Sequence, residues 1–260
     1  MIYRAEEDYY KNYISRLGLA VSEDGFNFRR YSGKPILEEN PKEPHEKQGC
    51  EDPRIVKITD SDYFLTYVSY GGAEDIQLRG ANSKDLVHFE KIGQLVKGRE
   101  KSGAIIQDYK YKGQYVMYFG DKVLHIAYSR DLKNWKVVTE PVLTPRKNEF
   151  DNCLVEGGPP PIVTDEGIFM IYNSAKEGKA YKTGKKWLSY SPGFAIFDKQ
   201  NPAKLLFRSD KPIMEAEEYW EKYGKVNYVI FATGLVEFKG KWLLYYGGAD
   251  KSIGVAEIKF

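Results

Sequence analysis

Short apolar segments separated by turns recur along the whole chain. In four segments, at residues 62–67, 113–118, 167–172 and 240–245, a turn is followed by an apolar run that ends in Tyr. Aromatic and β-branched residues favour strands, and Gly and Asp favour turns. No long segment has apolar residues at helical spacing. The pattern therefore predicts an all-β protein.

A second repeated pattern, Ser-x-Asp-[Gly/Leu]-x-x-aromatic, occurs at residues 22–28, 83–89 and 129–135. Each copy follows a short apolar strand. We expect the Ser and Asp side chains to close a turn by bonding to the backbone. The aromatic residue then anchors the next strand.

Repeats near 50 residues, each with three or four short strands, are typical of a β-propeller. The repeated units are residues 1–36, 54–96, 103–145, 158–210 and 227–260. We therefore predict that residues 1–260 form one five-bladed β-propeller domain. A two-sheet sandwich is the alternative, but it does not explain the repeats. The first unit is short, so we expect it to lack an N-terminal strand or to be completed from the C-terminal segment.

Composition narrows the class of function. The formal net charge is only +2, from 39 basic and 37 acidic residues, which gives no reason to expect a nucleic-acid partner. The chain has no apolar run of membrane-spanning length and no signal-like start, and it contains two cysteines. We expect a cytoplasmic protein without a membrane partner. Aromatic residues make up 15% of the chain, which suits carbohydrate binding, although strand propensity also explains them.

Residues 49–55, Gly-Cys-Glu-Asp-Pro-Arg-Ile, place two carboxylates and a guanidinium before a strand. Pro53 restricts the preceding residue, so we expect Asp52 to be extended where a loop enters the sheet. A carboxylate held beside an Arg suits a site that protonates or grips a hydroxyl-rich ligand. The alternative is a turn with a surface Arg–Asp pair of little energetic weight.

The inner strands of a propeller converge on a central funnel, where Asp52, Glu156 and Asp250 are candidate acids. Glycoside hydrolysis uses a pair of carboxyl groups that flank the scissile bond. Glu156 precedes a rigid Gly-Gly-Pro-Pro-Pro run and Asp250 follows a Gly-Gly pair, so either could instead serve a turn. We predict that the three acids share one cavity.

Other chemistries lack a supporting pattern. The three histidines, His45, His88 and His125, and the two cysteines, Cys50 and Cys153, do not have metal-ligand spacing. The sequence contains no phosphate loop, nucleophile elbow or dinucleotide fingerprint. We therefore predict no metal and no cofactor.

Taken in order, the motifs resemble glycoside hydrolase family 130, the mannoside phosphorylases and β-mannosidases built on five-bladed propellers. The resemblance spans nearly the whole chain and rests on residues 3–5, 19–25, 49–55, 101–104, 115–121, 155–160 and 245–250. It implies that Asp52 is the catalytic acid, acting in phosphorylases through a hydroxyl of the bound mannose. The predicted substrate-binding residues are Arg4, Asp24, Glu51, Arg54, Lys101, Ser102, Asp121, Asn173, Tyr246 and Asp250.

Departures from the family pattern decide the predicted reaction. The phosphorylases hold phosphate with an Arg, a Lys and a His, and these align with Gly120, Leu154 and Asn173. Losing three cations removes charge-assisted phosphate contacts, whereas Glu156 repels phosphate and can activate water. We therefore expect an inverting hydrolase of β-1,2- or β-1,4-mannosides, with Asp52 as acid and Glu156 as base about 6.5–9.5 Å apart.

Two alternatives stay open. One is a β-mannoside phosphorylase that binds phosphate through Lys101, Lys176 or Lys179 and releases mannose 1-phosphate. The other is a non-catalytic sugar-binding propeller, which is favoured by the short first unit and by Thr233, where hydrolase-like relatives often carry Glu. Related five-bladed families that act on arabinose, xylose or fructose match the motifs less well.

Overall fold

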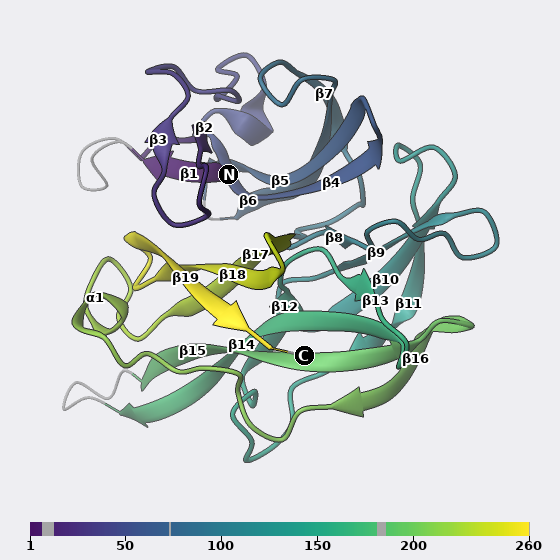
Figure 1. Cartoon of the computed structure of the whole chain (residues 1–260), viewed down its shortest axis with the longest axis vertical. Helices are drawn as coiled ribbons and strands as arrows, with labels where there is room; N and C mark the ends of the chain where they lie inside the picture. The colour runs from purple at the N-terminus through teal and green to yellow at the C-terminus, as the bar shows by residue number, and fades with distance from the viewer. Residues whose placement is uncertain (7–12, 73, 181–185, 260) are drawn as a thin grey trace.

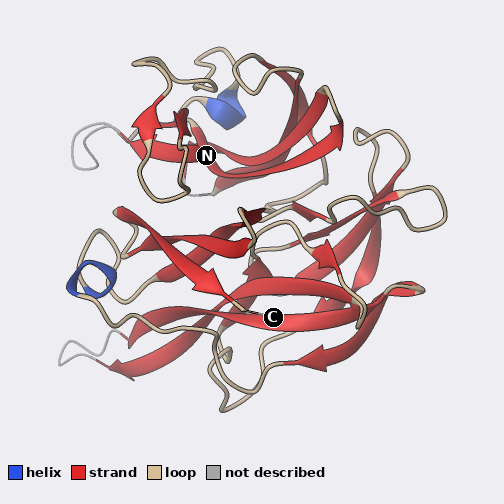
Figure 2. Cartoon of the chain, in the orientation of Figure 1, coloured by secondary structure: helices blue, strands red, loops and turns tan. Residues whose placement is uncertain are grey.

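The strands form five small antiparallel sheets, arranged as a five-bladed β-propeller (Figure 1). The computed structural model describes residues 1–6, 13–72, 74–180 and 186–259. Within these ranges almost all regular structure is strand (Figure 2). The prediction of an all-β five-bladed propeller is confirmed.

Each blade follows the order of the chain. Blade 1 contains β1 (Ile2–Glu6), β2 (Ser15–Val21) and β3 (Arg29–Arg30). Blade 2 contains β4 (Cys50–Thr59), β5 (Asp62–Gly72), β6 (Asp75–Ser83) and β7 (Phe89–Gln94). Blade 3 contains β8 (Ala104–Ile105), β9 (Tyr115–Phe119), β10 (Leu124–Ser129) and β11 (Lys136–Leu143).

Blade 4 contains β12 (Leu154–Gly157), β14 (Ile168–Ala180), β15 (Lys186–Asp198) and β16 (Asn201–Arg208), and β13 (Ile162–Val163) also pairs with β14. Blade 5 contains β17 (Ile230–Phe238), β18 (Lys241–Gly248) and β19 (Ser252–Ile258). Two short helices, η1 (Pro44–Glu46) and α1 (Tyr219–Lys222), lie in connections between blades. No helix in the described ranges is long and apolar enough to cross a membrane.

Blades 2 and 4 begin earlier than the predicted starts at 54 and 158. Strand β4 starts at Cys50 and β12 at Leu154, so Asp52 and Glu156 belong to inner strands rather than to the loops before them. Strand β4 contacts both β1 and β17. These inner strands bring together residues that are far apart in sequence.

The Ser-x-Asp pattern closes turns as predicted. In each copy the Asp carboxylate accepts backbone N–H groups two and three residues later, with Asp24, Asp85 and Asp131 as the acceptors. The Ser hydroxyl of each copy accepts a further N–H, from the Asp backbone. This bonding is the side-chain closure expected of such turns.

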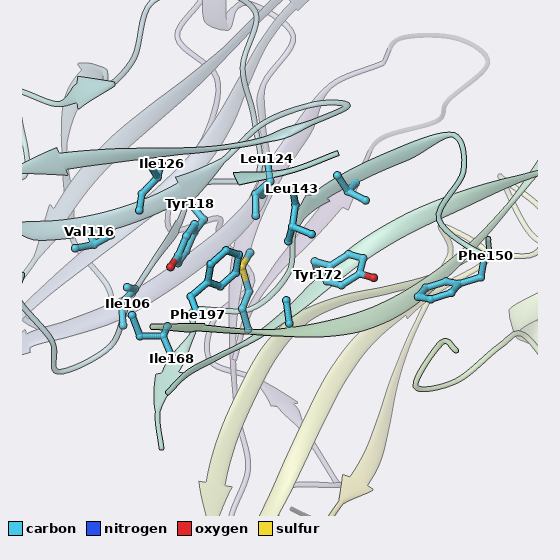
Figure 3. Close-up of a cluster of buried hydrophobic side chains, with 13 residues drawn as sticks. Ile106, Val116, Tyr118, Leu124, Ile126, Leu143, Phe150, Ile168, Tyr172 and Phe197 are labelled. Atoms are coloured by element: carbon cyan, nitrogen blue, oxygen red, sulfur yellow. The ribbon is translucent and has the colours of Figure 1, made fainter. Parts of the chain in front are cut away.

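The tyrosines that end the first repeated pattern join separate parts of the fold. Tyr118 in blade 3 donates to the carbonyl of Pro202 in blade 4 at 2.7 Å, and Tyr245 in blade 5 donates to that of Gly25 in blade 1 at 2.7 Å. Tyr118 also packs against Phe197 in the large apolar cluster between blades 3 and 4 (Figure 3). Packing therefore accounts for these aromatic residues.

Candidate active site

Asp52 lies in a β-bulge at the start of β4. Glu51 pairs with Val68 and Arg54 with Thr66, so β4 has one more residue than β5 across this stretch. Asp52 takes a φ of 47°, in the left-handed region, and the prediction of an extended Asp52 is wrong. The bulge is the physical reason, because an inserted residue re-aims a side chain in a way that a regular strand does not allow.

Positive φ values recur around Asp52 in the spatial cluster described below. Ser102 has a φ of 56° shortly before β8, and Asp250 has one of 55° in the turn after β18. Left-handed backbone at a residue other than Gly costs roughly 1–3 kcal/mol and tends to gather at functional sites. Left-handed residues also occur in turns elsewhere, such as Leu86 and Lys239, so the candidate site is assigned from the charge cluster together with this backbone.

Two arginines from different strands contact Asp52. Arg4 Nη1 in β1 donates to the Asp52 carboxylate at 2.9 Å, and Arg54 Nη1 donates to the Asp52 carbonyl at 3.1 Å. Arg54 is buried and also donates to the carbonyls of Gly157 and Gly158, at 2.6 and 2.7 Å. Arg54 therefore ties blade 2 to the start of blade 4, whereas Arg4 faces the acid itself.

The charges around Asp52 set its protonation state. Burial acts to raise the pKa of Asp52, but the nearby cations, Arg4 first, outweigh it and hold that pKa below its ordinary value. The side chain keeps 24% of its surface exposed. Asp52 is therefore ionised at neutral pH and accessible to a ligand.

Glu156 is the most deeply buried of the three candidate acids, with a side chain only 2% exposed. Ser102 Oγ donates to Glu156 Oε2 at 2.7 Å, and Lys101 Nζ lies 3.7 Å from the same oxygen. Burial raises the pKa of Glu156, and Lys101 and Ser102 offset only part of that shift. Lys101 also pairs with Asp121 at 2.9 Å, so blades 3 and 4 share one charge network here.

Asp250 joins the cluster through Lys225. Lys225 Nζ lies 3.9 Å from Asp250 and 2.6 Å from Glu6, and Glu6 forms an ion pair with Arg4. Burial raises the pKa of Asp250, while the charges of Arg4 and Lys225 oppose the shift. The charge of Asp52 acts on the pKa of Asp250 and also on that of Glu156, which indicates that the three acids form one electrostatic cluster. That they line one cavity stays a prediction.

The remaining predicted residues fall into two groups. Glu51 belongs to the cluster, because its carboxylate is 3.3 Å from Arg4 Nη2. Asn173 and Tyr246 are engaged by other residues of the protein, and their predicted role in sugar binding stays a prediction. The Asn173 amide is fully buried and bonds to the backbone N–H and C=O of Ala232 at 2.7 and 2.8 Å. Tyr246 is buried and donates to Glu221 at 2.7 Å.

Asp24 has no contact with the cluster among the described residues, and its assignment to the sugar site stays a prediction. Its turn contacts the turn between β17 and β18, where Lys239 Nζ donates to the carbonyl of Glu23 at 2.8 Å. Asp250 follows the opposite end of β18. The carboxylate of Asp24 is occupied by backbone and Asn27 donors of its own turn. The contacts of Asp24 are therefore those of the Asp in each copy of the Ser-x-Asp turn.

Sequence reasoning missed three members of the cluster. Glu6 and Lys225 form the ion pair that links Arg4 to Asp250, and Tyr13 bonds to both Arg4 and Glu51. Tyr13 lies before β2 and Lys225 before β17, in connections without a repeated pattern. The one signal in the sequence was their position shortly before a predicted strand. Among the described residues no group of three or more His, Cys, Asp or Glu is arranged to hold a metal ion.

Comparison with known proteins gives a match over the full chain. Residues 1–260 match the family model of glycoside hydrolase family 130, described as β-1,4-mannooligosaccharide phosphorylase. The 1,2-β-oligomannan phosphorylase of Thermoanaerobacter sp. (strain X514) is 37% identical, over 100% of this chain and 87% of the relative.

Solved structures of similar proteins also match nearly the whole chain. A glycosyl hydrolase from Bacteroides ovatus superposes with a TM-score of 0.88 at 33% identity, covering 98% of this chain and 79% of that one. A second structure has a TM-score of 0.88 at 32% identity with the same coverage. Its description says that the family of mannoside phosphorylases contains glycoside hydrolases. These hydrolases target β-1,2 mannosidic linkages in Candida mannan.

Proposed function

The chain belongs to glycoside hydrolase family 130, and we propose that it cleaves β-1,2-mannosidic bonds in manno-oligosaccharides with inorganic phosphate as the acceptor. The observation that carries the proposal is the full-length similarity to a 1,2-β-oligomannan phosphorylase. The similar structure described with hydrolases involves the β-1,2 linkage too. The linkage is thus common to relatives that use either acceptor.

Phosphorolysis was the alternative to the expected hydrolysis, and the curated relatives favour it. The structure offers two cations around Asp121 for a phosphate ion, and one of them, Lys101, also lies 3.7 Å from Glu156. Lys101 Nζ is 2.9 Å from Asp121, and Arg99 forms an ion pair with the same carboxylate. Both cations come from the segment before β8 and keep part of their side chains exposed, 27% for Lys101 and 44% for Arg99. A phosphate that replaces Asp121 as their partner gains charge-assisted hydrogen bonds.

The proposed roles follow from the cluster. The C1–O bond of the β-mannoside breaks while a phosphate oxygen bonds to C1 from the opposite face, which gives α-mannose 1-phosphate. The leaving oxygen needs a proton, and the family resemblance assigns its delivery to Asp52 through a hydroxyl of the mannose. Because Asp52 is ionised in the free protein, this role requires that bound sugar cover the carboxyl group and raise its pKa. Arg4 and Asp250 are proposed to hold the mannose ring.

Hydrolysis is the second candidate, and a specific observation favours it. None of the three positions aligned with phosphate ligands provides a cation. A side chain at Gly120 would collide with the carbonyl oxygen of Val123, Leu154 is apolar, and the Asn173 amide is engaged by Ala232. If water is the acceptor, Glu156 is the proposed base.

A panel of β-1,2- and β-1,4-linked mannobiose, each incubated with and without phosphate, tests the linkage. The proposal predicts turnover of the β-1,2 isomer at a kcat/KM at least tenfold above that of the β-1,4 isomer. Preference for β-1,4-mannobiose would contradict the proposed linkage. Binding of mannobiose without turnover under either condition would indicate a non-catalytic sugar-binding propeller.

A further inference from the structure

We propose that Tyr13 is a positioning residue that keeps Arg4 directed at Asp52, an inference that rests on the function proposed for this site. The Tyr13 hydroxyl accepts a hydrogen bond from Arg4 Nη2 and donates one to Glu51 Oε1. It therefore bridges a guanidinium and a carboxylate that already lie 3.3 Å apart. Nothing in the family motifs points to this residue.

The contacts of Arg4 leave its guanidinium little freedom. Nε donates to Ser15 Oγ at 3.2 Å, Nη1 to Asp52 at 2.9 Å, and Nη2 to Glu6 and to Tyr13. Each nitrogen thus has its own direction. Only the Nη1 contact reaches the proposed acid, so the other contacts decide whether Nη1 stays there.

The ring of Tyr13 is itself held in place. It meets Tyr70 edge to face, with ring centroids 5.3 Å apart, and Lys225 Nζ lies 4.8 Å from its centroid. Aromatic and cation–π contacts of this kind fix a ring without occupying its hydroxyl. The hydroxyl is therefore presented to Arg4 and Glu51 in a defined position.

Glu51 competes with Asp52 for the guanidinium of Arg4, and the Tyr13 hydroxyl bonds to both Arg4 and Glu51. Its carboxylate is already 3.3 Å from Arg4 Nη2. Without the hydroxyl, Glu51 loses a donor and Arg4 loses an acceptor, so the two ions move together and Nη1 turns away from Asp52. The hydrogen bond from Tyr13 also lowers the pKa of Glu51, and Arg4 lowers that of Asp52. Movement of Arg4 away from Asp52 therefore raises the pKa of Asp52, whereas at Glu51 the closer guanidinium opposes the loss of the Tyr13 hydrogen bond.

Tyr13→Phe removes the hydroxyl and keeps the ring, and Tyr31→Phe is the matched control, since Tyr31 belongs to the same blade and is 54% exposed. For Tyr13→Phe we expect kcat/KM on β-1,2-mannobiose to fall roughly tenfold or more, as for the loss of other orienting contacts. The pH midpoint that reports Asp52 moves to higher pH, because Arg4 no longer faces it. In the background of Glu51→Gln the same change has a smaller effect, because the competing charge is gone.

A crystal structure of Tyr13→Phe reports on the inference without relying on activity. We expect the Arg4–Glu51 contact to shorten and the Arg4–Asp52 contact to lengthen. An unmoved Arg4 would overturn the positioning role, as would a pH profile and kcat/KM equal to those of Tyr31→Phe. Absence of turnover by the wild-type protein with either acceptor would instead refute the proposed function, and the Arg4 geometry would still be measurable. A thermal melt of each variant separates loss of positioning from loss of fold.

Discussion

Ser102 Oγ donates to Glu156 Oε2 at 2.7 Å, so the most buried acid of the cluster, on blade 4, is held by a residue that precedes the inner strand of blade 3. The left-handed φ of 56° at Ser102 accompanies this contact. Lys101 Nζ lies 3.7 Å from the same oxygen, so a hydrogen-bond donor and a cation both face Oε2 of this carboxylate. Its charge therefore acts on whatever acceptor binds beside it.

Replacing Asp52 by Asn removes the proposed acid while keeping a hydrogen-bonding acceptor for Arg4. We expect kcat/KM to fall about 10²–10⁴-fold, the range for loss of a general acid. Asp60→Asn is the matched control, because Asp60 is fully exposed and, within the part of the chain that the structure describes, forms its ion pair with the neighbouring Lys57. Steady-state kinetics on β-1,2-mannobiose gives the answer, and unchanged turnover in Asp52→Asn would remove Asp52 from the chemistry.

Glu156→Gln distinguishes the two acceptors. The amide keeps the Ser102 contact but removes a negative charge from the proposed phosphate site. If phosphate is the acceptor, the KM for phosphate falls roughly threefold to tenfold, because like-charge repulsion is relieved. If Glu156 is the base that activates water, turnover falls about 10²–10⁴-fold instead. Initial rates over a phosphate series decide between the two results.

Lys101→Met removes a cation and keeps most of the side-chain length. The proposed phosphate site then loses a charge-assisted contact, and we expect the KM for phosphate to rise at least roughly tenfold. Lys57→Met is the control, since Lys57 is exposed and pairs with Asp60. A phosphate KM that does not change in Lys101→Met would show that phosphate, if used, binds elsewhere.

Glu156 also makes folding stability depend on pH. Its pKa is raised in the folded protein, so the folded state binds the proton more tightly than the unfolded state does. The stability that this proton gives is complete below the ordinary carboxyl pKa, and it is lost as pH rises through the raised value. Glu156→Gln does not titrate, so its free energy of unfolding relative to wild type increases from pH 4 to pH 7.5. Urea denaturation at the two pH values measures the difference, with Glu237→Gln as an exposed control. An equal difference at both would contradict the sign.

Much of the fold could be predicted because the blades repeat. The Ser-x-Asp pattern closes a turn and the Tyr-ended segment forms a strand in several blades. The spacing of these patterns in the sequence therefore predicts the number and order of the blades. The candidate acids Asp52, Glu156 and Asp250 were found because each lies at the start or end of a predicted strand. Each also lies within a motif that resembles the family.

The rest of the site depends on features that one sequence does not display. The left-handed Asp52 follows from a register shift between β4 and β5, which requires knowing which residues pair. The Asn173 amide bonds to the backbone of Ala232, and this contact depends on how blades 4 and 5 pack. Tyr13 and Lys225 come from connections without periodicity, where tertiary contacts alone give a side chain its role.

Phosphate is the proposed acceptor for β-1,2-mannoside cleavage at this cluster. Incubating the protein with β-1,2-mannobiose in phosphate-free buffer and in phosphate, and following the products by NMR, tests it most directly. We predict α-mannose 1-phosphate and mannose in equal amounts, with no cleavage when phosphate is left out. Release of mannose alone, at the same rate in both buffers, would contradict the claim and identify a hydrolase.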